Sequence, residues 1–172
     1  MFAGLLGPLS HPVLIVMCVL TNRSESRERE AMNEISHPEI QPATWWRRLC
    51  EVTDRLFVSG DLPYQPMDPE GFQRVLDEWL DAGITHIVDL RGEANDAANV
   101  VRVAPHVNYT WLGTHDAGGD QEFSWYDRGV EAITEALDDP DARVVVHCHM
   151  GVNRAPSMAY AALLQLGHDV EE

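Results

Sequence analysis

Between residues 55 and 147, short apolar runs alternate with longer stretches in which apolar residues recur every three or four positions. Four short runs are rich in β-branched and large apolar residues and are bounded by turn-forming or polar residues, a pattern typical of strands. They predict strands over 55–60, 84–90, 109–112 and 143–147. The run 84–90 is a candidate for a strand buried on both faces, as in a parallel sheet.

Two of the longer stretches have the spacing of amphipathic helices. Asp68-Pro69 is a helix-start signal, and Gly83 is expected to end the helix that follows. The inner face of this helix is predicted to be Phe72, Val75, Leu76, Trp79 and Leu80. The second helix ends before Asp138-Asp139-Pro140, and its predicted inner face is Tyr126, Val130, Ile133 and Leu137.

Strands that alternate with helices predict an α/β fold of three layers, with a largely parallel central sheet flanked by helices. A further helix is predicted from Arg154 onwards. The methionine and aromatic positions of the helices are interpreted as core residues, and we expect no cofactor.

The first part of the chain differs in composition. Residues 12–20 are an apolar run that is much shorter than a membrane span, and residues 21–43 are polar and charged. We therefore predict an extension over 1–43, largely disordered, and one folded domain over 44–172. No Lys or Arg precedes the apolar run and no clear cleavage site follows it, which disfavours a secretory signal. Our preferred interpretation is that translation starts at Met32.

Charge and cysteine content narrow the function classes. The 12 basic residues against 28 acidic ones give a formal net charge of −16, which disfavours nucleic acid as a partner. The segment Trp45-Trp46-Arg47-Arg48 is interpreted as packing on the domain. Three cysteines do not make a disulfide framework, so we expect a reducing, cytoplasmic location.

The strongest chemical signal is His147-Cys148-His149-Met150-Gly151-Val152-Asn153-Arg154, directly after the predicted strand 143–147. Its pattern H-C-x-x-G-x-x-R has a chance frequency on the order of one in a thousand in a chain of this length. A thiol at a strand end, followed by a loop and an arginine that opens a helix, makes a phosphate cradle with a nucleophile at its base.

Each residue type in this loop fits that chemistry. A thiolate is the reactive form of a cysteine, and a helix N-terminus favours both a thiolate and a bound anion. The N–H groups of residues 149–154 can surround phosphoryl oxygens, and Gly151 allows backbone angles that other residues avoid. Arg154 offers a planar fork that matches two phosphate oxygens. The plainer alternatives are a buried structural cysteine with a surface arginine, or a metal site at His147, Cys148 and His149, although no partner ligand motif is present.

The loop resembles the C-x5-R signature of the cysteine-dependent protein phosphatases, and residues 50–172 resemble their dual-specificity and tyrosine phosphatase family. The resemblance implies hydrolysis of phosphotyrosine, and of phosphoserine or phosphothreonine, on proteins through a phosphocysteine intermediate without a metal. It makes Cys148 the nucleophile, and the residues that would hold the phosphate are His149, Met150, Gly151, Val152, Asn153 and Arg154. His147 would shape the loop and tune the thiol.

The family also needs an acid that protonates the leaving oxygen. Asp116 lies 32 residues before Cys148, a separation typical of this family, in a glycine-rich loop after a predicted strand. Asp120, Glu122 and His115 are competing candidates, and a chain without a working acid is a further alternative. The order of acid before cysteine disfavours the low-molecular-weight tyrosine phosphatases, and the five residues between Cys148 and Arg154 disfavour rhodanese-type sulfurtransferases.

The chain departs from the family pattern at several positions. Ala155 stands where Ser or Thr usually helps the thiolate to leave, although Ser157 matches a hydroxyl position of the longer pattern. Asn153 makes the loop similar to that of the RNA 5′-phosphatase branch, which keeps that function as an alternative. Similar phosphatases continue through another helix beyond Glu172, so the resemblance predicts a shortened C-terminus.

One further motif of the family, Asp89-Leu90-Arg91, stands at the end of a predicted strand. Arg91 there is interpreted as part of a structural salt bridge in preference to a substrate contact. A catalytically weak phosphate-binding module is the alternative outside enzymes, because of Ala155 and the short C-terminus. The expected partner is a phosphorylated protein.

Overall fold

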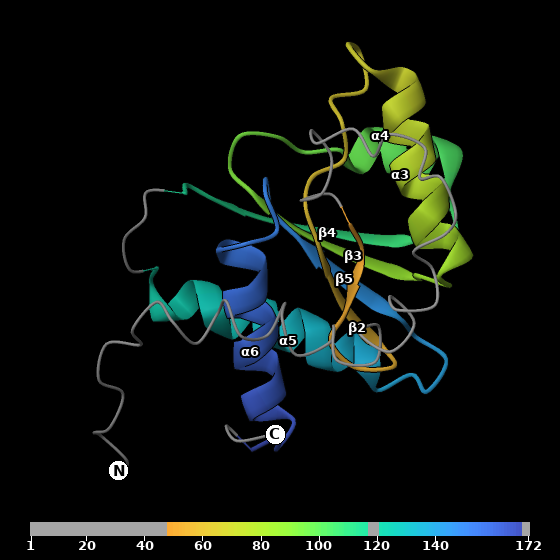
Figure 1. The fold of residues 1–172 in the computed structure, drawn as a ribbon. Coiled ribbons are helices and arrows are strands. Elements are labelled where there is room, and N and C mark those ends of the chain that lie inside the picture. The colour runs from red at the N-terminus through yellow and green to blue at the C-terminus, as the bar shows by residue number, and fades with distance from the viewer. Residues whose placement is uncertain (1–47, 117–120, 170–172) are drawn as a thin grey trace, which may run out of the picture.

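A computed structural model describes residues 48–116 and 121–169 of the chain. These residues form a five-stranded mixed sheet with the strand order β1-β2-β5-β3-β4 (Figure 1). The strands are β1 Cys50–Glu51, β2 Leu56–Ser59, β3 His86–Arg91, β4 Asn108–Thr114 and β5 Val144–His147. The helices in the described residues are α3 Pro69–Asp81, α4 Ala97–Val103, α5 Phe123–Leu137 and α6 Arg154–Gln165.

The sheet is largely parallel, as the sequence predicts. Strands β2, β5, β3 and β4 pair in parallel, and only the short edge strand β1 runs antiparallel to its neighbour β2. β5 is the central strand, because Val146 is opposite Val58 on one side and Val88 on the other. The loop that follows β5 therefore begins at the centre of the sheet, where the parallel strands have their carboxyl ends.

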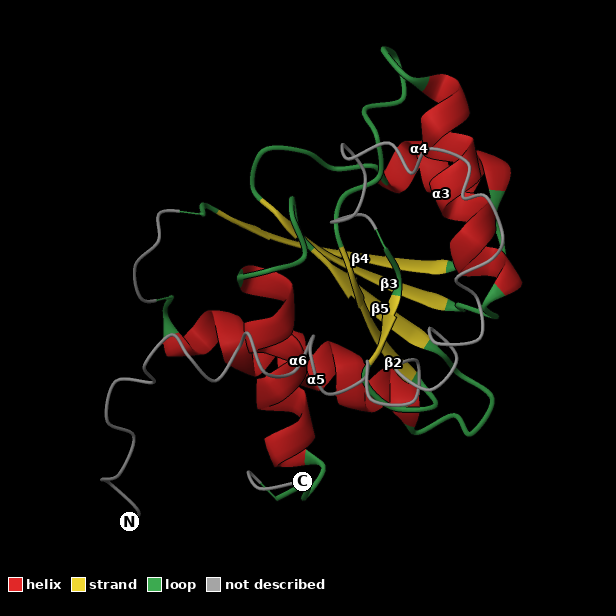
Figure 2. Ribbon diagram, in the orientation of Figure 1, coloured by secondary structure: helices red, strands yellow, loops and turns green. Residues whose placement is uncertain are grey.

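The helices cover both faces of the sheet, with α3 and α4 on one side and α5 and α6 on the other (Figure 2). Successive side chains of a strand point to opposite faces. Val144 and Val146 accordingly contact the core under α5 and α6, whereas Val145 contacts the core under α3 and α4. The three-layer α/β arrangement is confirmed.

The predicted helix starting at Asp68-Pro69 forms as α3. The Asp68 carboxylate accepts a hydrogen bond from the Gly71 N–H at 2.8 Å, and Pro69 occupies the first helical position, where its missing N–H costs nothing. Gly83 has φ +79° just after the helix end and donates its N–H to the Leu80 carbonyl. The local signals at both ends are sufficient to set this helix.

Other boundaries differ from prediction. The predicted strand 84–90 begins two residues later, because the Ile84 N–H bonds to the Trp79 carbonyl at the end of α3 and not to a strand. β4 extends beyond 109–112 at both ends. In α5 the fully buried face is turned by about one residue: Trp125 and Gly129 are buried, whereas Tyr126 and Val130 are only partly buried.

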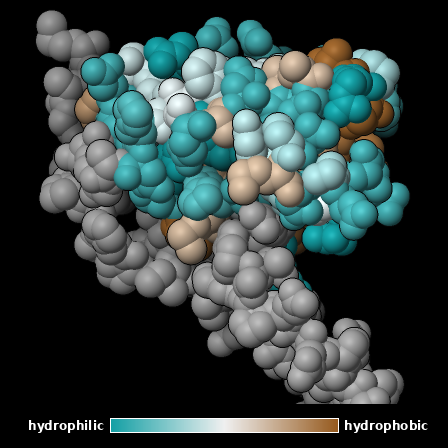
Figure 3. All heavy atoms as spheres, turned by 90° about the horizontal axis from the view of Figure 1, so that it is seen from above, coloured by the Kyte–Doolittle hydropathy of each residue, from teal (hydrophilic) through white to brown (hydrophobic). Residues whose placement is uncertain are grey.

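Two elements were not predicted, β1 and α4. α4 has seven residues, of which only Val100 is buried, and that is too short for a helical period to be recognised. The predicted extension 1–43 lies outside the described residues. Of the helices that are described, none is both long and apolar enough to traverse a bilayer. Figure 3 shows a face of the molecule that is mostly hydrophilic with small apolar patches.

Candidate active site

The loop after β5 lies at the carboxyl ends of the parallel strands, where open α/β sheets bind their ligands. Cys148 is 1 % exposed and directly follows the central strand, and its N–H donates to the Ser59 carbonyl of β2 at 3.4 Å. Residues 149–154 (the phosphate loop) then lead into α6, which begins at Arg154. The predicted order of strand, thiol, loop and helix is present.

Gly151 is required in this loop for two reasons. Its φ of +70° lies in the left-handed region that side chains disfavour. A Cβ atom at this position would also lie 2.9 Å from the Gly60 nitrogen and 2.9 Å from the Ser59 carbonyl carbon. The phosphate loop therefore approaches the β2–α3 connection so closely that only glycine fits.

The N–H groups of the phosphate loop are available as donors. Within the described part of the chain, none of the N–H groups of residues 149–154 donates to a backbone carbonyl or to a side chain. Such groups next to a helix N-terminus form an anion-binding concavity. These N–H groups can donate hydrogen bonds to a phosphoryl group without breaking hydrogen bonds of the fold.

Arg154 is 2 % exposed and is held by a carboxylate that sequence analysis missed. Its two terminal nitrogens donate to Glu93 at 2.9 and 2.8 Å, and Nη1 also donates to the Thr114 carbonyl at 2.8 Å. These hydrogen bonds lower the pKa of Glu93 to about 2, and the same carboxylate raises the pKa of Arg154 against the opposing effect of burial.

The Nε of Arg154 is buried and has no hydrogen-bond partner among the residues that the structure describes. An unsatisfied buried N–H costs free energy unless a ligand supplies an acceptor. A phosphoryl oxygen would supply it, while Glu93 fixes the plane of the guanidinium. Glu93 stands two residues after Arg91 in the sequence, and an acidic residue just beyond a strand end is the signal that could have suggested it.

Among the predicted acids, Asp116 is the one that the structure brings against the phosphate loop. Its Oδ1 accepts a hydrogen bond from Asn153 Nδ2 at 2.8 Å, and its Oδ2 lies 3.5 Å from Arg154 Nη2. Its side chain is 40 % exposed, so a proton can reach it from solvent. Glu122 and His115 are exposed, and within the described residues neither side chain hydrogen-bonds to the phosphate loop; Asp120 lies outside the described residues.

The exposed side chains of the phosphate loop are apolar or polar, and none of them is Lys or Arg. Met150 and Val152 are 41 % and 49 % exposed. His149 Nδ1 lies 3.1 Å from Asp61 Oδ2, and the Asp61 N–H donates to the His149 carbonyl. These contacts tie the phosphate loop to the β2–α3 connection.

His147 and Cys148 point to opposite sides of the sheet. The His147 ring is fully buried, with its centroid 5.1 Å from that of Trp79 and its Nε2 3.5 Å from Asp89 Oδ1. Burial lowers the pKa of His147 to about 4, although Asp89 favours the charged form. The His147, Cys148 and His149 side chains therefore do not converge as metal ligands would.

Arg91 belongs to a buried ion-pair network and not to the phosphate-binding surface. It donates to Asp89 through Nε at 2.9 Å and through Nη2 at 2.8 Å, and Nη2 also donates to Asp96 at 2.6 Å. Tyr109 donates its hydroxyl to Asp89, and burial together with that carboxylate raises the pKa of Tyr109. The network supports the end of β3 below the site, as the salt-bridge interpretation predicts.

The hydroxyl of Ser157 is engaged elsewhere. It donates to the Asn153 carbonyl at 2.8 Å, which is a local bond within the first turn of α6. Ala155 is fully buried in the core under α5 and α6. Neither residue donates a hydrogen bond to Cys148.

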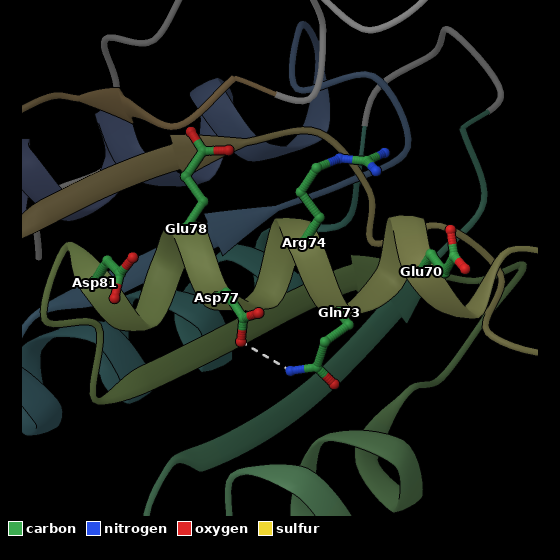
Figure 4. A pocket seen from close by; sticks show the side chains of 6 residues that line it. All are labelled: Glu70, Gln73, Arg74, Asp77, Glu78 and Asp81. Atoms are coloured by element: carbon green, nitrogen blue, oxygen red, sulfur yellow. Dashed lines mark hydrogen bonds between the residues drawn. The ribbon is translucent and has the colours of Figure 1, made fainter.

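One surface hollow of the described residues lies on α3, away from the phosphate loop. Figure 4 shows that it is lined by side chains of one helix, α3, with Glu70, Asp77, Glu78 and Asp81 among them. It is open, acidic and built on the solvent face of a helix whose other face packs on the sheet. We assign it no function.

Comparison with known proteins agrees with the geometry. No protein-family model matches the chain. Among solved structures, a variant of Tk-PTP superposes with a TM-score of 0.57 at 18% identity, over 73% of this chain and 77% of that one. A variant of human DUSP28 gives 0.54 at 17% identity over 72% and 75%, and DUSP15 gives 0.53 at 14% identity over 69% and 66%. The chain thus spans just under two-thirds of the DUSP15 chain, and its fold is that of the dual-specificity and tyrosine phosphatases.

Proposed function

We propose that the chain is a cysteine-dependent phosphatase that hydrolyses phosphotyrosine, and also phosphoserine or phosphothreonine, on proteins. The observation that carries this proposal is the buried Arg154, whose Nε has no hydrogen-bond partner among the described residues, next to the phosphate loop after Cys148, whose N–H groups donate to no described carbonyl or side chain. A cradle of this kind has donors for every non-bridging oxygen of a phosphoryl group and a sulfur nucleophile at its base.

The first step transfers the phosphoryl group to sulfur. The Cys148 thiolate attacks phosphorus in line, the S–P bond forms and the ester P–O bond breaks. Arg154 and the phosphate loop hold the non-bridging oxygens, and the Asp116 carboxyl gives its proton to the leaving oxygen. In the second step water attacks phosphorus, its proton goes to the Asp116 carboxylate, and the S–P bond breaks to return the thiolate.

The rim favours a substrate with few charges beyond the phosphate. Met150 and Val152 present apolar surface beside the cradle, and all 12 basic residues of the chain are arginines. A phosphotyrosine ring can contact such a rim, whereas a polyanionic RNA end would meet a net charge of −16. We therefore place the RNA 5′-phosphatase second, although Asn153 is typical of that branch.

A weakly catalytic phosphate-binding module is the alternative outside enzymes. It is favoured by Ala155, and by the Ser157 hydroxyl being bonded to the Asn153 carbonyl. Both features remove a hydroxyl that could stabilise the departing thiolate.

Turnover of three substrates distinguishes these functions: a phosphotyrosine peptide, a phosphothreonine peptide and 5′-triphosphorylated RNA. We expect the phosphotyrosine peptide to be hydrolysed fastest, with activity that survives EDTA, is blocked by vanadate and disappears in Cys148→Ser. Loss of activity in EDTA that zinc restores would refute the mechanism. Phosphate binding without turnover of any substrate would instead support the binding module. Because the nucleophile is a reduced thiol, we also propose that the protein works in a reducing compartment such as the cytoplasm.

A further inference from the structure

Asn153 stands at the N-cap of α6, but its side chain does not cap the helix. An asparagine at this position usually accepts a hydrogen bond from a backbone N–H of the first helical turn. Here no such bond forms, and Nδ2 donates to Asp116 Oδ1 at 2.8 Å. The side chain is directed across the mouth of the site to a residue 37 positions earlier in the chain.

The backbone of Asn153 is held in place independently of this contact. Its carbonyl accepts the Ser157 hydroxyl at 2.8 Å and the Ser157 N–H at 3.1 Å. The amide group therefore projects from a fixed point between the phosphate loop and α6. A donor on a fixed base can orient its hydrogen-bond partner.

Asp116 is such a partner. It lies two residues beyond the end of β4, and its side chain is 40 % exposed. With Oδ1 held by Asn153, Oδ2 lies on the side of Arg154, 3.5 Å from Nη2. Because Arg154 would hold the phosphoryl group, Oδ2 is the oxygen placed to carry the transferable proton.

We propose that Asn153 is a positioning residue that orients the Asp116 carboxyl for proton transfer to the leaving oxygen. This inference rests on the proposed phosphatase function. In the first step the proton on Asp116 Oδ2 moves to the ester oxygen as the P–O bond breaks. In the second step the same oxygen takes a proton from the attacking water. Nδ2 donates to Oδ1 throughout and exchanges no proton.

The test compares phenyl phosphate with 4-nitrophenyl phosphate, which differ in how much protonation the leaving group needs. Binding of the phosphoryl group is common to both, so the ratio of their kcat/KM values isolates the contribution of the acid. Asn153→Ala should lower kcat/KM about 10- to 100-fold for phenyl phosphate, the usual scale for a lost hydrogen bond to a charged group. It should change kcat/KM for nitrophenyl phosphate much less.

A double-mutant cycle with Asp116→Asn separates positioning from a structural role. If Asn153 acts through Asp116, then Asn153→Ala should leave kcat/KM for phenyl phosphate almost unchanged when Asp116 is already replaced by Asn. A defect of the phosphate loop would lower kcat/KM equally for both substrates, and this loss would persist in the Asp116→Asn background.

Asn153→Asp is the second variant, because Asp is as good an N-cap as Asn and suits a helix N-terminus. A capping role predicts unchanged activity, whereas positioning predicts a changed substrate ratio at least as large as in Asn153→Ala, since two carboxylates would repel. Asn108→Ala is the matched control: Asn108 begins β4, and its Nδ2 lies 2.9 Å from His86 Nε2 at the start of β3, at the opposite end of these strands from the site. Thermal unfolding of all variants shows that they are folded.

Three outcomes are distinguishable. A selective loss on phenyl phosphate that vanishes in the Asp116→Asn background supports the inference. If the wild type is active, and the Asn153 variants lose kcat/KM equally for both substrates and additively with Asp116→Asn, the inference alone is overturned. A wild type without thiol-dependent turnover overturns the proposed function, and the inference with it.

Discussion

The stability of this protein should fall as the pH drops from about 6.5 to 4, and His147 is the main cause. The ring is fully buried between Trp79 and Asp89, and its pKa in the folded state is about 4 against 6.5 for an unperturbed histidine. Between these two values the unfolded chain binds a proton that the folded chain does not. The contribution of the uncharged His147 to the free energy of unfolding is therefore fully present above pH 6.5 and is lost as the pH falls towards 4.

The size of the effect follows from the difference in pKa. About 2.5 pH units at 1.36 kcal/mol each give about 3 kcal/mol, a large fraction of the 5–15 kcal/mol that stabilises a typical domain. Asp89 already limits the loss, because this carboxylate favours the protonated ring, whereas Arg91 in the same network opposes it. Without Asp89 the folded-state pKa of His147 would be lower still.

Urea unfolding at half-unit pH steps from 4 to 7.5 measures this dependence. His147→Gln removes the titration, so the free energy of unfolding of this variant should vary less with pH across the window, even if the variant is less stable at pH 7. His106→Gln at an exposed position is the matched control and should keep the wild-type slope. Parallel curves for wild type and His147→Gln would show that another group causes the acid sensitivity.

Four further predictions concern the loop, its counter-charge and the surface. Gly151→Ala should destabilise the fold by about 1–3 kcal/mol and weaken vanadate inhibition, because its Cβ would overlap Gly60 at φ +70°; unfolding and inhibition titrations check this. Glu93→Gln should lower the free energy of unfolding at pH 7 and make it decrease less below pH 4.5. In this range Glu93, with its pKa of about 2, stays ionised only in the folded state, and urea unfolding as a function of pH measures the difference. Wild type should show a burst with nitrophenyl phosphate, and Ala155→Ser should raise the steady-state rate without changing the burst rate; a linear stopped-flow trace from the first turnover would contradict this. Added KCl should raise kcat/KM for anionic substrates, because salt screens the net charge of −16; a fall would indicate that local positive charge dominates.

The sequence predicts best those features that are set by nearby residues. α3 is correctly predicted because Asp68 and Gly83 mark its two ends, and its inner residues repeat with helical spacing. The loop with Gly151 and Arg154 is equally local, since the eight neighbouring residues 147–154 specify a strand end, a tight turn and a helix start. In contrast, α4 buries a single side chain and leaves almost no periodic signal.

The contacts that complete the site connect distant parts of the chain and could not be predicted from spacing. Glu93 is 61 residues from Arg154, and it reaches the guanidinium only because β3 and β5 are neighbours in the sheet. The bond between Asn153 and Asp116 depends likewise on where β4 ends relative to α6. From the sequence, Asn153 is predicted to belong to the phosphate-binding loop and to mark the RNA 5′-phosphatase branch, whereas the structure shows in addition a contact with the candidate acid.

The charge distribution bears on how an acidic protein would hold a phosphoryl group under the proposed function. Arg154 is buried, and Glu93 balances its charge. The remaining donors are the N–H groups of the phosphate loop and Arg154 Nε, which bind oxygen at short range and add no net charge beyond that of the arginine. Under the proposed function, affinity for a single phosphoryl group would therefore come from local geometry, while the net charge of −16 acts at longer range against polyanions. This combination is a further argument for the proposed substrate, one phosphate on an otherwise weakly charged partner, as on a phosphotyrosine side chain.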